Sequence, residues 1–235
     1  MTTICPEQYT EVNSAVRLNR PMDNLDAIAD KIRTGLTAKS AARDVTLARS
    51  RELVRFCSLA IRATHREEFA EAQRLLGTAR AAADEMKADI VDHPDLYYTG
   101  YTQDALKELA EAYITFAVVN GRSLPTPEEL GVDTAAYLNG LCEAASELRR
   151  RTLDVIRRGD MAEGERLLAA MDDVYGVLVT MDYPDAITGG LRRSTDALRA
   201  VLERTRGDLT NSLQQDKLLR ELQEFERRIN SKAGH

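Results

Sequence analysis

The sequence predicts an all-α fold: a single-domain antiparallel bundle of about six or seven helices, with a long first helix. Apolar residues recur at helical spacings of three and four through most of the 235 residues. No stretch shows the period-two, β-branched pattern that is typical of strands. Short runs rich in Pro, Gly, Asn and Asp separate the helical stretches, as in bundles with short connections.

The first half of the chain contains two long predicted helices. Residues 1–22 have weak periodicity and are expected to form an N-terminal arm. The first helix is expected over about 23–65, with Gly35 as a point that softens it. The second is expected over about 67–92, because Pro94 cannot continue it.

The middle of the chain carries clear helix-end signals. A third helix, about 101–119, is expected to end at Asn120-Gly121, which tolerate a left-handed backbone. Thr126-Pro-Glu-Glu129 predicts a capping box with Pro at the first helical position, and Gly131 limits it to a short turn. Asp133 is expected to cap a fourth helix that ends at Gly159.

The last third of the chain predicts further helices. A fifth helix is expected to begin at Asp160 and to reach about residue 181. Residues 182–185 are expected to interrupt the helical structure. Residues 188–229 predict one or two helices, with a joint between them at Gly207. The domain is therefore expected to span 23–230, followed by a frayed tail at 231–235.

Composition limits the function classes. Apolar residues make up 43% of the chain but aromatic residues only 5%, and Trp is absent, so the core must consist mainly of Leu, Ala, Val and Ile. The net charge of −6 gives no overall sign of nucleic-acid binding. The basic residues are nevertheless concentrated early, because residues 1–65 have a net charge of +3.

The three cysteines show no paired spacing, and two of them lie in apolar helical contexts. Reduced Cys acts there as a small hydrophobic residue, so a reducing, cytoplasmic location is expected. The N-terminus lacks the basic start and apolar run of a signal peptide, and no stretch approaches a membrane-spanning length. No membrane association is expected.

Two helical segments each place two carboxylates on one face. Glu108 and Glu111 are three residues apart, and Glu143 and Glu147 are four apart; such pairs lie about 5–6 Å from each other between Cβ atoms. If the two faces pack together, four carboxylates converge, and their oxygen ligands suit Mg²⁺ or Mn²⁺. These glutamates are candidate metal ligands and catalytic residues for cutting a phosphodiester.

A simpler interpretation of the same residues stays open. Glutamate favours helices and is common on solvated faces. With Arg150 and Arg151 on the next turn, ion pairs at i,i+3 and i,i+4 spacing explain this acidic face without a metal. Arg150 is also a candidate for balancing charge on a scissile phosphate.

A basic stripe follows the first helix. Its members recur at spacings of four, three, four and three: Arg51, Arg55, Ser58, Arg62 and His65. Together with Arg43, which extends the basic character towards the N-terminus, the stripe is a candidate nucleic-acid surface. A solvated face that pairs with acidic neighbouring helices, with His65 as a cap or packing residue, explains the pattern equally well.

Three tyrosines, Tyr97, Tyr98 and Tyr101, lie in and after the turn that precedes the third helix. Tyrosine rings can stack on unpaired bases. Anchors buried beneath a loop are an equally good explanation of the same residues.

An ordered series of short segments resembles the translin family, over about residues 41–208. The segments are Ala-Arg43-Asp44-Val-Thr, Ile61-Arg-Ala-Thr-His65, Leu106-Lys-Glu108-Leu-Ala-Glu111-Ala, Tyr137-Leu-Asn-Gly140, Ala145-Ser-Glu147-Leu and Gly159-Asp160, followed by Leu191-Arg-Arg and Arg206-Gly207. The resemblance implies a helical subunit of a hollow octameric shell that binds RNA or single-stranded DNA inside. It also implies, as in the family's catalytic members, a Mg²⁺-dependent endoribonuclease that acts on single-stranded RNA.

The resemblance assigns the acidic site to Glu108, Glu111, Glu143 and Glu147. The chain departs from the family at Glu143, where the nuclease members look to have Asp and translin an uncharged residue. Translin also lacks the two earlier glutamates, whereas the stretch around Glu147 is closer to translin. One chain is therefore expected to serve both as the nuclease subunit and as the translin-like subunit of a homo-oligomer.

Other functions remain open on the sequence. A translin-like protein could hold RNA or single-stranded DNA without cutting it. All-α nucleoside triphosphate pyrophosphohydrolases also pair a Glu-x-x-Glu with a later acidic pair, although their second pair is Glu-x-x-Asp. A purely structural helical protein would show neither binding nor turnover.

Overall fold

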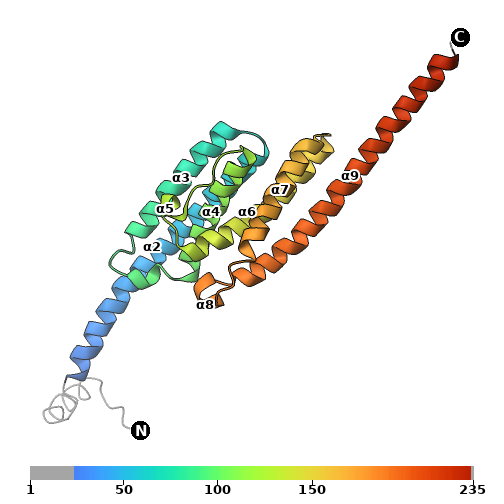
Figure 1. The fold of residues 1–235 in the computed structure, drawn as a ribbon. Coiled ribbons are helices and arrows are strands. Elements are labelled where there is room, and N and C mark those ends of the chain that lie inside the picture. Colours follow the sequence, from blue (N-terminus) through green and yellow to red (C-terminus); the bar gives the residue numbers. More distant parts are fainter. Residues whose placement is uncertain (1–23, 234–235) are drawn as a thin grey trace, which may run out of the picture. The chain divides into compact units, whose positions relative to one another are not determined.

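The computed structural model describes residues 24–233 and the side chains of 24–230. Its helices are α2 (Leu25–His65), α3 (Phe69–Ala88), α4 (Gly100–Val119), α5 (Pro127–Leu130), α6 (Thr134–Arg157), α7 (Met161–Leu178), α8 (Asp185–Thr188) and α9 (Leu191–Ala233), with a 3₁₀ turn at Pro94–Leu96 (Figure 1). No strand occurs between residues 24 and 233, which confirms the all-α prediction. The predicted N-terminal arm lies outside the described residues.

The chain divides into two compact units, Met1–Val45 and Thr46–His235, and the boundary falls within α2. In the described part of the first unit, α2 is largely exposed and carries local pairs such as Arg33 with Asp30. The second unit contains the core and every side chain of the site described below. Within residues 24–233, no helix is long and apolar enough to cross a membrane.

Helix α6 lies at the centre of the second unit. It packs against α4, α7 and α9, and α4 packs in turn against α3 (Figure 1). Leucines from these elements, among them Leu106, Leu148 and Leu198, are almost completely buried. The core is built mainly from Leu, Ala, Val and Ile, as the composition predicts.

Local signals set several of the helix ends. Thr126 and Glu129 form the predicted capping box, and Gly121 and Gly131 adopt the left-handed backbone that ends α4 and α5, at φ 62° and 60°. Asp160 accepts a hydrogen bond of 3.0 Å from the Glu163 amide and so caps α7. Asp133 occupies the predicted N-cap of α6, but its side chain makes no capping hydrogen bond.

The predicted joint at Gly207 is wrong. Helix α9 runs unbroken from Leu191 to Ala233, with Gly207 exposed on its outer face. Thr205 and Leu209, on the opposite side, are buried against the rest of the second unit. That packing outweighs the cost of about 1 kcal/mol for a glycine in a helix interior.

Candidate functional site

A close crossing of α4 and α6 builds the site. At Gly140 the two backbones approach so closely that an added Cβ would lie 2.7 Å from the carbonyl oxygen of Lys107 and 2.8 Å from Cβ of Ala110. Only glycine fits this crossing without movement of a helix. It places Glu143, about one turn further along α6, opposite the acidic face of α4.

Three of the predicted glutamates meet at this crossing. Glu108, Glu111 and Glu143 each offer one carboxylate oxygen, and these oxygens all lie within 4.8 Å of one another. We call these three residues the carboxylate cluster. All three are partly buried, so solvent screens their repulsion incompletely. The structure thus brings together two helix faces that the sequence could show only separately.

The cluster is electrostatically strained. Burial raises the pKa of Glu111 to about 8, with further contributions from the charges of Glu108, Glu143 and Glu147. Burial also raises the pKa of Glu108, and the charge of Glu143 adds to this effect while that of Lys107 opposes it. The cluster therefore holds a proton at neutral pH unless a cation replaces it.

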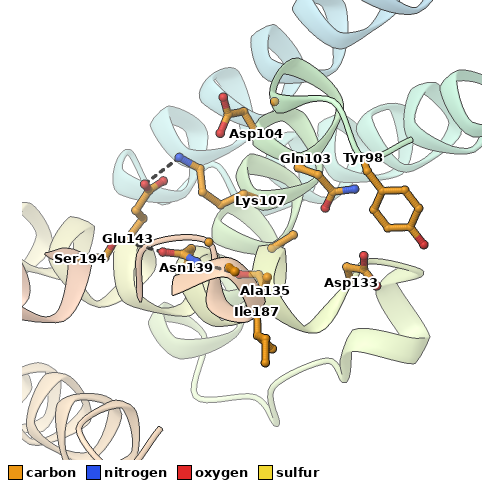
Figure 2. A pocket seen from close by; sticks show the side chains of 14 residues that line it. Tyr98, Gln103, Asp104, Lys107, Asp133, Ala135, Asn139, Glu143, Ile187 and Ser194 are labelled. Atoms are coloured by element: carbon orange, nitrogen blue, oxygen red, sulfur yellow. Dashed lines mark hydrogen bonds and ion pairs between the residues drawn. The ribbon is translucent and has the colours of Figure 1, made fainter. Parts of the chain in front are cut away.

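Lys107 supplies one positive charge at the edge of the cluster. Its Nζ lies 2.7 Å from Oε1 of Glu143 (Figure 2). The same Nζ lies 3.9 Å from Oε1 of Glu108. Burial alone would lower the Lys107 pKa, but the hydrogen bond to Glu143 and the neighbouring carboxylates outweigh it and raise the pKa. Lys107 is not among the residues predicted from the sequence, because its position before Glu108 does not reveal which helix it will reach.

Glu147 lies next to the cluster and contacts His65. Its Oε1 is 2.6 Å from Nε2 of His65, whose side chain is only 2% exposed. Nδ1 of His65 has no hydrogen-bond partner among the described residues. The structure thus places His65 beside the acidic residues and out of the exposed stripe.

The ion pairs that the simpler interpretation expected do not form within residues 24–230. Arg151 is buried, and its Nη1 lies 2.8 Å from Oε1 of Glu67 instead. Arg158 also pairs with this carboxylate. Both arginines lower the pKa of Glu67 through their hydrogen bonds.

The predicted phosphate contacts are exposed. Arg51, Arg55 and Arg62 on α2 and Arg150 on α6 lie at the surface, and none has an ion pair with another described residue. Arg43 belongs to the first unit and pairs with Asp44 at 2.9 Å. The predicted tyrosines differ in exposure. Tyr98 is 71% exposed, whereas the Tyr101 hydroxyl is buried and has no hydrogen-bond partner among the described residues.

Asn139 is a supporting residue that the sequence analysis missed. Its Nδ2 donates to the carbonyl of Thr188 at 2.7 Å, and its Oδ1 accepts from Oγ of Ser194 at 3.0 Å. These bonds tie α6 to α8 and α9 just before Gly140. Its place in the Tyr-Leu-Asn-Gly element was the available signal.

Comparisons with known sequences give one relative and no family model. No protein-family model matches the chain. An uncharacterised protein of Methanocaldococcus jannaschii is 28% identical over 186 residues, which are 78% of this chain and 82% of that protein.

The solved structures of similar fold include three of C3PO proteins. The structure of AfC3PO with duplex RNA is 31% identical, with a TM-score of 0.73, and covers 78% of this chain and 95% of its own. The crystal structure of AfC3PO gives 30% identity and the same TM-score, covering 78% of this chain and 96% of its own. Apo-NeC3PO, at 19% identity and a TM-score of 0.70, covers 83% of this chain and 100% of its own, and shows the fold alone. The identity and coverage of the AfC3PO structures show that this chain belongs to the translin family, which includes the C3PO proteins.

Proposed function

We propose that this chain is an RNA-binding, metal-dependent endoribonuclease that cuts single-stranded RNA at the carboxylate cluster, inside a homo-oligomeric shell of eight subunits. The observation that carries the proposal is the convergence of Glu108, Glu111 and Glu143 within 4.8 Å. A solvated helix face does not explain why three glutamates from two helices meet at one partly buried point.

The residues fit a bound Mg²⁺ ion, with Mn²⁺ as a substitute. The donors are carboxylate oxygens alone, which these hard cations prefer over zinc. The raised pKa of Glu111 supports this fit, because a cation relieves the same repulsion that otherwise retains a proton. Glu108, Glu111 and Glu143 would hold the ion, and Glu147 is a fourth candidate ligand beside them.

A bound Mg²⁺ ion polarises a phosphodiester and lowers the pKa of an attacking water. The chain's own residues supply binding and orientation. Lys107, at the edge of the cluster, can transfer its contact from Glu143 to a phosphate oxygen. Arg150 and the exposed arginines of α2 supply further positive charge for the strand.

The choice of ligand has independent support. A C3PO protein that is 31% identical to this chain was solved with duplex RNA. Single strands are the proposed substrate for cutting because of the resemblance to the catalytic members of the family, and single-stranded DNA is a further candidate ligand. Single-stranded RNA and duplex RNA should therefore both be tested.

A second candidate function is RNA binding without cutting. It is favoured by Lys107, which already neutralises part of the cluster without any metal ion. In this case the lysine would stabilise the crossing of α4 and α6, and the surface arginines alone would hold the strand.

The test is cleavage of labelled single-stranded and duplex RNA by the full chain, in Mg²⁺ or in EDTA. We expect cutting of the single strand only in Mg²⁺, and a loss of at least about 100-fold in Glu108→Gln and Glu143→Gln. Glu221→Gln, a change at an exposed glutamate on α9, is the matched control. Tight RNA binding with no cutting in any sample would leave the second candidate.

A further inference from the structure

A pocket of about 580 Å³ lies beside the carboxylate cluster (Figure 2). The start of α4, the first half of α6 and the junction of α8 with α9 form its walls. It shares Lys107 and Glu143 with the site described above. Its size is in the range of small-molecule sites. Whatever occupies this pocket therefore lies next to a group bound at the cluster.

The charged lining argues against a phosphate in the pocket itself. Three carboxylates, those of Asp104, Asp133 and Glu143, line it together with one cation, Lys107, which is already bonded to Glu143. Neither Asp104 nor Asp133 accepts a side-chain hydrogen bond from another residue in the described part of the chain. The carboxylates of Asp104 and Asp133 are therefore free to accept hydrogen bonds from a ligand. They suit a neutral group that carries N–H donors.

An aromatic surface lies on the other side of the pocket. Tyr98 is 71% exposed, and in Figure 2 its ring lies with Asp133 across the pocket from Lys107 and Glu143. The rings of Tyr97 and Tyr98 pack edge to face, with centroids 5.0 Å apart and an interplanar angle of 86°. Tyr97 packs against the core, so the turn is held while Tyr98 remains accessible for stacking.

We propose that this pocket binds one nucleobase of the RNA strand whose phosphate lies at the cluster, and that it selects bases with an exocyclic amino group. The base stacks on Tyr98 and donates its amino hydrogens to Asp133, which lies on the same side of the pocket as Tyr98 (Figure 2). Adenine, cytosine and guanine carry that group, whereas uracil has none: its exocyclic positions are carbonyl oxygens, which a carboxylate repels, and its one donor is the ring N3–H between them. This inference rests on the proposed function and adds base selection to it.

Fluorescence anisotropy of labelled oligo(A), oligo(C) and oligo(U) RNA tests the proposal. The titrations use full-length protein in the Glu111→Gln background, which keeps the RNA intact. We expect about tenfold tighter binding of oligo(A) and oligo(C) than of oligo(U). Tyr98→Ala should weaken the binding of all three by about tenfold, which corresponds to about 1.4 kcal/mol.

Matched variants separate stacking from charge. Tyr98→Phe should retain binding because the ring remains, and Tyr183→Ala removes a 60% exposed tyrosine that does not line the pocket. Asp133→Asn should remove the preference over oligo(U) without unfolding α6, since Asn is an equally good N-cap residue. Equal affinity for all three RNAs, together with no effect of Tyr98→Ala, would overturn the pocket proposal.

The outcomes distinguish this proposal from the proposed function. Mg²⁺-dependent cutting of RNA without base preference would overturn the base pocket and leave the nuclease standing. Base-selective binding by the wild type without any cutting would support the pocket and count against the nuclease. Tyr98-dependent binding and hydrolysis of free ATP, without RNA binding, would show that a free nucleotide supplies the base and would overturn the RNA strand as its source.

Discussion

The ammonium nitrogen of Lys107 on α4 lies 2.7 Å from Oε1 of Glu143 on α6. This contact neutralises part of an acidic cluster whose members come from both helices. The protein can therefore fold with three carboxylates in one place, while Glu111 keeps a pKa of about 8.

Removing the charge of Glu111 should change how stability depends on pH. Its pKa rises from 4.5 to about 8 on folding, so the folded chain binds more protons between these values and loses stability as the pH rises through this window. In EDTA, Glu111→Gln should melt several degrees above the wild type at pH 8.5 and within about two degrees of it at pH 5. Thermal melts at both pH values, with Glu221→Gln as control, measure this. A difference that is the same at both pH values would contradict the assignment.

Gly140→Ala should disrupt the crossing of α4 and α6. The added Cβ meets Lys107 and Ala110 at 2.7 Å and 2.8 Å, so the helices must separate at a cost of about 1–3 kcal/mol. Urea denaturation and Mg²⁺ titration should show both the lost stability and at least tenfold weaker metal binding. The matched control is Gly207→Ala, which meets open space on α9 and should stabilise by about 0.5–1 kcal/mol. Equal effects of the two changes would contradict the close crossing.

Lys107→Gln should make the fold depend more strongly on divalent ions. Without the ammonium group the cluster loses its internal cation, so the melting temperature in EDTA should fall by several degrees. The rise in melting temperature on adding Mg²⁺ should then exceed that of the wild type. Lys217→Gln, on the outer part of α9, controls for loss of a surface charge. If the Mg²⁺-induced rise were unchanged, Lys107 would not neutralise the cluster.

Glu147→Gln should weaken Mg²⁺ binding less than Glu108→Gln does. Oε1 of Glu147 is bonded to His65 at 2.6 Å, whereas the oxygens of Glu108 face the other two cluster glutamates. We expect a loss of at least tenfold in affinity for Glu108→Gln and of about threefold for Glu147→Gln, by calorimetric titration. The reverse order would show that Glu147 is a principal ligand and that the three-glutamate cluster is incomplete.

The arginines of α2 should control the salt dependence of RNA binding. Arg51, Arg55 and Arg62 are exposed and have no ion pair with another described residue. Each phosphate contact that is lost should reduce the slope of log affinity against log salt by about 0.7 for a single strand. The measurement is anisotropy over a salt series, with Arg74→Gln as control, because Arg74 already pairs with Glu71. An unchanged slope would place the RNA elsewhere.

Local signals in the sequence predicted much of the fold. The capping box at Thr126 and the glycine at position 121 act within one turn, so their chemistry is legible without tertiary information. The predicted helix joint at Gly207 was wrong because it depends on tertiary packing. Whether a glycine breaks a helix depends on what packs beside it, and Leu209 is buried on the inner face of α9.

The candidate site was predictable only as separate helix faces. The three-residue spacing of Glu108 and Glu111 fixes their common side, but the meeting with Glu143 depends on the crossing at Gly140. His65 shows the limit of periodicity. Its spacing continues the basic stripe, yet the end of α2 lies against α6 and buries the imidazole beside Glu147.

The most direct test of the central claim is an anomalous diffraction map from crystals of the full chain grown with Mn²⁺. We predict a peak bounded by the carboxylates of Glu108, Glu111 and Glu143, with Nζ of Lys107 displaced from Glu143, and no such peak in crystals of Glu108→Gln. A map in which the cluster holds no ion and Lys107 keeps its bond to Glu143, in protein that binds RNA without cutting it, would contradict the claim.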